Sequence, residues 1–226
     1  MARDDDCLPL PEEAANDAAL AVLAARGCTG SFAVLTARHH VAIVHYARRL
    51  LARRGGPRAG CDAEDVVQET FLRAWRELGR YDPRYTFSTW LFTIGRRACL
   101  NHLRGERRHA DRLSRAARDR ETDHAASVSG DETAGGAANS LWGLAARTLS
   151  ERQFTALWLR YVEEMPAAGI ARVLASTTVG ARLTLMRARR RLETEMRSAA
   201  VGSADRTAAV TPVPIPLLRP LPPPAS

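Results

Sequence analysis

Lysine is absent from this 226-residue chain, which carries 33 arginines instead. Codon bias in a GC-rich genome would favour arginine over lysine and would also explain the many alanines. It does not explain the excess of base over acid, which gives a formal net charge of +8. That excess indicates a polyanionic partner, and the planar guanidinium of arginine is well suited to grip phosphate.

Other absences exclude whole classes of protein. The chain has no signal-peptide pattern and no apolar run of membrane-spanning length, so we expect a soluble, cytoplasmic protein. The four cysteines form no C-x-x-C pair, and no histidine stands at zinc-ligand spacing from one of them. We therefore expect no metal and no cofactor. We also expect no enzyme, because acids do not converge with histidine and no glycine-rich phosphate loop follows a strand.

Hydrophobic residues recur at helical spacing, and no alternating strand pattern of any length is present. The sequence therefore predicts an all-α fold, in two small helical domains. The first domain is expected at 31–104. Its helices are predicted over 31–54, over 62–78 with Asp62 as N-cap, and from about Ser88 to about Arg104. The apolar stripe of the middle helix contains Phe71 and Trp75.

The second domain is expected at 141–197. Ser150 and Gln153 fit a capping box at the start of one helix, and Pro166 begins a short helix. Ala175 to Thr177 then form a turn before a final helix, so the pattern is that of a helix-turn-helix. Three segments outside the domains complete the prediction: a mobile acidic extension at 1–30, a flexible linker at 105–140, and a proline-rich, disordered tail at 198–226.

Two stretches carry a family resemblance. Region 2 of bacterial sigma factors resembles the stretch DAEDVVQETFLRAW followed by FSTWLFTIGRRACLNHLR. Within that family, the sequence is most similar to the extracytoplasmic-function (ECF) branch. LSERQFTALWLRYVEEM, with GIARVL and RARRRL after it, resembles region 4 of the same family. Both occur in the family's order. The resemblance implies a specificity subunit that binds RNA polymerase core and directs promoter recognition, melting and transcription initiation.

In that family the helix equivalent to 62–78 binds the clamp helices of RNA polymerase. The matching polar positions here are spaced i, i+4 and share one face of the helix: Glu64, Asp65, Gln68 and Glu69. A solvated helix face with acids near its positive end would look the same. The rest of the motif favours the docking role.

The loop that follows, and the helix after it, match the family's reader of the melted minus-ten element. A flipped base needs a polar pocket with an aromatic wall, and single-stranded DNA needs cations beside it. Trp90 is more consistent with a core aromatic than with a base contact. The predicted minus-ten residues are Tyr81, Asp82, Arg84, Tyr85, Thr86, Arg96, Arg97, Asn101 and Arg104.

The helix-turn-helix should bind the minus-thirty-five element as duplex in the major groove. Here the chain departs from the family, because Ala175 stands where relatives have glycine in the turn, and Thr184 replaces an expected arginine. Gly180 should weaken the recognition helix by roughly 1 kcal/mol relative to alanine. The predicted contacts are Thr178, Arg182, Thr184, Arg187, Arg189, Arg190 and Arg191.

Three interpretations follow from the sequence. The favoured one is an ECF sigma factor that binds RNA polymerase core and promoter DNA, as duplex and as melted strand, with an anti-sigma factor as a further partner implied by the resemblance. A stand-alone helix-turn-helix regulator is the second, although it gives no reason for the 62–104 pattern. A degenerate sigma-like interaction protein is the third, and the altered 175–184 segment is its best support.

Overall fold

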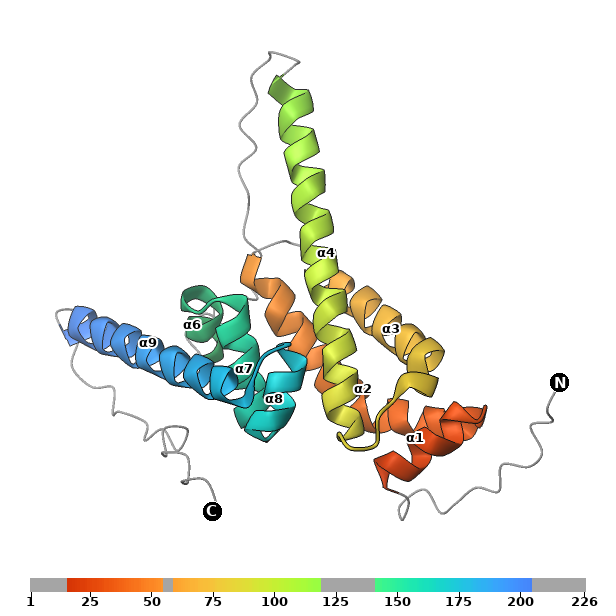
Figure 1. Ribbon diagram of the computed structural model, residues 1–226. Helices are drawn as coiled ribbons and strands as arrows, with labels where there is room; N and C mark the ends of the chain where they lie inside the picture. Colours follow the sequence, from red (N-terminus) through yellow and green to blue (C-terminus); the bar gives the residue numbers. More distant parts are fainter. Residues whose placement is uncertain (1–15, 55–58, 119–140, 205–226) are drawn as a thin grey trace, which may run out of the picture.

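A computed structural model describes residues 16–54, 59–118 and 141–204 of the chain, and every regular element in those ranges is helical (Figure 1). The predicted all-α fold is thus confirmed. The first half of the predicted acidic extension (1–15), the linker from residue 119 and the tail from residue 205 lie outside the described residues. Residues 17–25 of that extension form a helix instead of a mobile segment, and residues 198–204 of the predicted tail continue the last helix. None of the described helices combines the length and apolar content needed to cross a membrane.

Four α-helices form the first domain, and short 3-10 turns follow two of them. Asn16 begins the first helix because its side chain accepts a hydrogen bond from the backbone N–H of Ala19, at 2.8 Å. The helices pack through one apolar face each, with Tyr46, Phe87 and Phe92 among the most deeply buried side chains. The elements are α1 (Asp17–Ala25), α2 (Thr29–Leu51), η2 (Ala52–Arg54), α3 (Ala59–Glu77), η3 (Leu78–Arg80) and α4 (Phe87–Arg118).

Helix α4 is longer than the sequence predicts. The expected end is near Arg104, with a linker from residue 105, but the helix continues to Arg118. Gly105 is the weakest helix former in a stretch rich in arginine and alanine, and a single glycine costs about 1 kcal/mol. After Leu103 no side chain from residue 104 to residue 115 is buried, and this part of α4 projects away from the other helices (Figure 1).

The second domain contains α6 (Leu141–Thr148), α7 (Glu151–Tyr161), α8 (Ala167–Val173) and α9 (Thr178–Ala204). The predicted capping box is present at the start of α7. The Ser150 hydroxyl accepts from the backbone N–H of Gln153, and the Gln153 side chain accepts from the N–H of Ser150. The predicted helix-turn-helix is present as α8 and α9.

The turn between α8 and α9 holds Ala175 at a φ of 49°, in the left-handed region that favours glycine. The N–H of Ala175 bonds to the carbonyl of Arg172 at 3.1 Å, and that of Ser176 to the carbonyl of Ala171 at 2.8 Å. This pair of bonds is the Schellman motif, whose left-handed position is usually glycine. The turn therefore has the left-handed geometry that glycine usually adopts, even though alanine occupies this position.

The two domains pack against each other and share one continuous set of buried side chains. The Tyr46 hydroxyl on α2 lies 3.0 Å from the Thr155 hydroxyl on α7, and both side chains are fully buried. Helix α8 lies against α4, where Gly169 stands so close to Thr89 that a Cβ added there would come within 3.0 Å of the threonine hydroxyl. No local pattern predicts this contact, because the two residues lie far apart along the chain.

Candidate nucleic-acid interface

The predicted polar face of α3 is on the surface, with Glu64, Asp65 and Gln68 exposed and Glu69 half-exposed. Two of the four residues are engaged within the domain. Glu64 accepts a hydrogen bond from Arg48 of α2 at 2.9 Å, and Glu69 pairs with Arg73 one turn along at 2.5 Å. Asp65 and Gln68 carry the exposed polar surface between these two ion pairs.

This polar face borders a groove of about 710 Å³ between α2 and α3. Trp75 belongs to the predicted apolar stripe, but 37% of it is exposed at the groove, where its ring packs on Phe32 with centroids 5.0 Å apart. Leu72 is 52% exposed beside it. Apolar surface next to carboxylates suits a protein partner, and the sequence stripe alone did not reveal it. The lining is Phe32, Thr36, His40, Val44, Arg48, Glu64, Asp65, Val67, Gln68, Phe71, Leu72 and Trp75.

The loop before α4 is built around two of the predicted minus-ten residues. The ring of Tyr81 packs edge-on against Phe87 and Trp90, and its hydroxyl donates to the carbonyl of Tyr85 at 2.8 Å. Trp90 is partly buried against the core, as the sequence favoured. The Thr86 hydroxyl accepts from the N–H of Thr89 at 3.2 Å and so caps α4. Tyr81 and Thr86 thus hold the loop in shape.

Asp82 and Arg84 form an exposed pair at the tip of the same loop. The Arg84 guanidinium donates to both oxygens of Asp82, with the shortest contact at 2.6 Å. These hydrogen bonds lower the pKa of the Asp82 carboxyl. Arg84 is the more accessible of the two, since 84% of its side chain is exposed. The ion pair with Asp82 therefore holds the solvent-exposed guanidinium of Arg84 in one orientation.

Three predicted residues form one outward stripe on α4. Arg97, Asn101 and Arg104 are all exposed, as their spacing predicted, and Arg104 reaches the Asn101 side chain at 3.5 Å. The projecting part of α4 adds further exposed arginines, at positions where the sequence predicted a linker: Arg107, Arg108, Arg112 and Arg115. The basic surface is therefore longer than predicted.

Arg96 and Tyr85 face the second domain instead of open solvent. The Arg96 guanidinium donates to both oxygens of Glu151 on α7, at 2.8 and 2.9 Å. The guanidinium of Arg172 on α8 lies over the Tyr85 ring, 4.9 Å from its centroid. Two of the predicted minus-ten residues are thus engaged by the domain that carries the helix-turn-helix.

On α9, the structure separates outward cations from an inward one. Arg182, Arg187, Arg190 and Arg191 are exposed, and Thr178 lies at the first position of the helix, partly exposed. Arg189 is partly buried, with its guanidinium 5.3 Å from the centroid of the Tyr161 ring. The Thr184 hydroxyl donates to the backbone carbonyl of Gly180 at 2.8 Å. Arg189 therefore contributes to packing, and the other four arginines form the basic surface.

Comparison with known proteins agrees with this layout. The family model described as "Sigma-70 region 2" matches residues 35–109, and that described as "Sigma-70, region 4" matches residues 142–192. Together they match more than half of the chain. The first match contains the loop and the α4 stripe, and the second contains the helix-turn-helix.

Two curated relatives are RNA polymerase sigma factors by name. CnrH of Cupriavidus metallidurans is 42% identical over 130 residues, which are 57% of this chain and 58% of CnrH. The ECF sigma factor SigG of Mycobacterium tuberculosis is 33% identical over 159 residues, covering 62% of this chain and 43% of SigG. The chain thus spans about half the length of these relatives.

A solved structure of CnrH in complex with the cytosolic domain of CnrY shares the fold. It superposes with a TM-score of 0.57 at 27% identity, covering 80% of this chain and 97% of that one. The two family models occur in the family's order, both relatives are named as RNA polymerase sigma factors, and the helical fold superposes on that of CnrH. The chain belongs to the extracytoplasmic-function branch of the RNA polymerase sigma factors.

Proposed function

We propose that this protein binds the core of bacterial RNA polymerase and directs it to promoters, where the first domain captures the melted minus-ten strand. The observation that carries the proposal is the separation of two surfaces on one domain. The groove and acids of α2 and α3 form one surface, and the loop and arginine stripe of α4 form the other. A subunit with two such surfaces can hold a protein and a nucleic acid at the same time.

Polymerase docking is assigned to the exposed part of the α3 face and to the groove beside it. Asp65 and Gln68 offer acceptors, while Leu72 and Trp75 offer apolar surface that gains free energy when a partner covers it. Glu64 and Glu69 already hold Arg48 and Arg73, so they position the face as well as extending it. An anti-sigma factor is a further proposed partner, since the solved relative CnrH is held by the cytosolic domain of CnrY.

DNA binding is assigned to two surfaces. Arg84, Arg97, Asn101 and Arg104 are exposed and can reach bases and phosphates of a separated strand. The exposed arginines of α9 can hold the phosphates of a duplex. Tyr85 and Arg96 become available to DNA only when the two domains separate, because Arg172 and Glu151 hold them in the present arrangement.

Co-purification with core polymerase, followed by run-off transcription on genomic fragments, tests this function. The double variant Asp65→Arg and Gln68→Arg changes two residues outside the α3 ion pairs, and it should abolish co-purification while leaving helicity unchanged. Asp111→Arg is the matched control, because Asp111 is exposed on the projecting part of α4. Normal binding by the double variant would refute the docking assignment, and the absence of any run-off product from wild-type holoenzyme would refute the function.

A further inference from the structure

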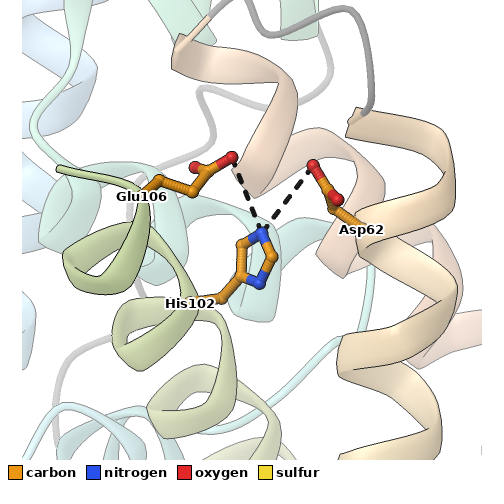
Figure 2. A group of neighbouring side chains, drawn as sticks. All are labelled: Asp62, His102 and Glu106. Carbon is orange, nitrogen blue, oxygen red and sulfur yellow. Dashed lines mark ion pairs between the residues drawn. The ribbon is translucent and has the colours of Figure 1, made fainter. Parts of the chain in front are cut away.

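Three potential metal ligands converge where α3 begins beside α4. Asp62 lies in the first turn of α3, while His102 and Glu106 are one turn apart on α4. Figure 2 shows the imidazole of His102 directed between the two carboxylates. Its Nε2 atom lies 3.7 Å from an oxygen of Asp62 and 3.7 Å from an oxygen of Glu106. One ligand atom from each residue lies within 4.8 Å of the other two.

The Nε2 atom of His102 is buried and has no hydrogen-bond partner. A hydrogen bond from imidazole to a carboxylate would bring the two atoms to about 2.7–3.2 Å, and both contacts are longer than that. An orphaned buried nitrogen is costly, with a typical penalty of about 1–3 kcal/mol. This nitrogen therefore faces a position that suits a third group between the carboxylates.

The spacing fits a divalent ion at that position. Nitrogen and oxygen ligands stand about 2.0–2.2 Å from Zn²⁺, so two ligands of a tetrahedral ion are roughly 3.3–3.6 Å apart. The two imidazole–carboxylate separations of 3.7 Å require a closure of only a few tenths of an ångström. The oxygens of Asp62 and Glu106 lie within 4.8 Å of each other and must approach by up to about 1.2 Å, through rotation of the exposed Glu106 side chain. Two carboxylates balance the charge of a divalent ion, while the neutral imidazole supplies its lone pair. One nitrogen with two oxygens suits Zn²⁺, Co²⁺ or Ni²⁺ better than Mg²⁺ or Ca²⁺, which prefer oxygen alone.

We propose that Asp62, His102 and Glu106 form a binding site for a divalent transition-metal ion, with Zn²⁺, Co²⁺ and Ni²⁺ as the candidate class and solvent completing the coordination. The ion joins the first turn of α3 to α4 beside the buried Leu103. Asn101 immediately precedes His102, and Arg104 follows it two residues later. The ion therefore also stabilises the part of α4 that carries the outward stripe of Arg97, Asn101 and Arg104. The site does not depend on the proposed function.

Metal binding is tested on the full chain without an affinity tag, stripped with a chelator. Isothermal titration should detect one equivalent of Zn²⁺ or Co²⁺ and no comparable binding of Mg²⁺. Bound Co²⁺ should give visible bands of nitrogen and oxygen ligands, without the near-ultraviolet thiolate band that a cysteine site would produce. With the metal at roughly 100 times its dissociation constant, the equilibrium constant for unfolding should fall about 100-fold.

Two variants and a matched control assign the site. His102→Gln and Glu106→Gln should each weaken binding at least tenfold, by analogy with the roughly 10–100-fold losses seen when metal-site partners are removed. Glu106 is exposed, so its variant keeps the fold even if the His102 variant is less stable. His109→Gln is the control, since His109 is exposed on α4 outside the cluster, and it should bind as wild type does. Full-strength binding by both site variants overturns the proposal. So does a wild-type chain that takes up no metal.

Discussion

Arg96 on α4 and Glu151 on α7 form a two-bonded ion pair across the interface between the domains, with N–O distances of 2.8 and 2.9 Å. Only 14% of the arginine side chain and 27% of the glutamate side chain are exposed. Glu151 also accepts from the Thr155 hydroxyl at 3.1 Å, and Thr155 lies 3.0 Å from the buried Tyr46 hydroxyl. A residue predicted to hold promoter DNA is thus part of a largely buried polar network that joins the two domains.

The first prediction is that Glu151→Gln opens the protein. A hydrogen bond to a charged group contributes about 1.5–3 kcal/mol, and glutamine cannot offer Arg96 two anionic oxygens. We expect a larger radius of gyration in small-angle scattering and tighter binding of single-stranded minus-ten DNA. Arg152→Gln is the control, because Arg152 is the next residue on α7 and is exposed. Equal radii for wild type and the Glu151 variant would contradict the prediction.

The second prediction concerns the place where α8 crosses α4. A Cβ at Gly169 would stand 2.7 Å from Met165 and 3.0 Å from the hydroxyl of Thr89, which is buried. Met165 is flexible, but Thr89 is held by the Thr86 hydroxyl at 2.9 Å, so α8 should move away. Gly169→Ala is expected to increase the radius of gyration in small-angle scattering while leaving the helix content unchanged. Helix α8 also packs against α7 and α9, so a single cooperative unfolding transition like that of the wild type would show that the second domain is intact. An unchanged radius of gyration would contradict the prediction.

Ala175→Gly is predicted to stabilise the protein by about 1 kcal/mol, because a side chain in the left-handed conformation costs roughly 1–2 kcal/mol and part of that gain is lost to the flexibility of glycine. Chemical denaturation measures the change. The same substitution at exposed Ala37, inside α2, should destabilise by about 0.5–1 kcal/mol. The prediction fails if both substitutions shift the free energy of unfolding in the same direction.

Base selection is predicted to depend more on the minus-ten surface than on α9. Scrambling the minus-ten sequence should cost more transcription than scrambling the minus-thirty-five sequence, because bidentate base contacts contribute about 1–3 kcal/mol each and Thr184 is bonded to its own helix. Arg84→Ala and Asn101→Ala should change the preferred minus-ten base. Thr86→Ala removes a helix cap and should cost about 1 kcal/mol of stability without changing the preference. Greater damage from minus-thirty-five substitutions would refute this.

Salt dependence should separate the outward arginines from the inward one. Removing one arginine–phosphate interaction reduces the slope of log affinity against log salt by roughly 0.7–0.9. Arg104→Gln and Arg187→Gln should each show that reduction in holoenzyme–promoter binding. Arg189→Gln should leave the slope unchanged, because its guanidinium packs on Tyr161. Equal slopes for all three variants would show that the orientation of these arginines does not matter.

Local patterns in the sequence predicted the fold class and several of the helices, although residues 17–30, expected as a mobile extension, form α1 and the start of α2. Apolar periodicity indicated the all-α fold, the Ser150 and Gln153 pattern marked the start of α7, and i, i+4 spacing put Arg97 and Asn101 on one exposed stripe. Each of these features depends on residues within a turn or two. The extension of α4 to Arg118 was missed because a charged, alanine-containing segment is equally typical of a linker and of a solvated helix.

Tertiary packing determines which predicted residues stand in solvent and which meet another part of the chain. Arg96 and Glu151 are 55 residues apart, and Asp62 meets His102 only because α3 packs on α4. The exposure of Trp75 depends in the same way on how α2 leaves a groove beside α3. Spacing along one helix fixes a direction around its axis. What lies in that direction is set by the packing of helices distant in sequence, which no local pattern records.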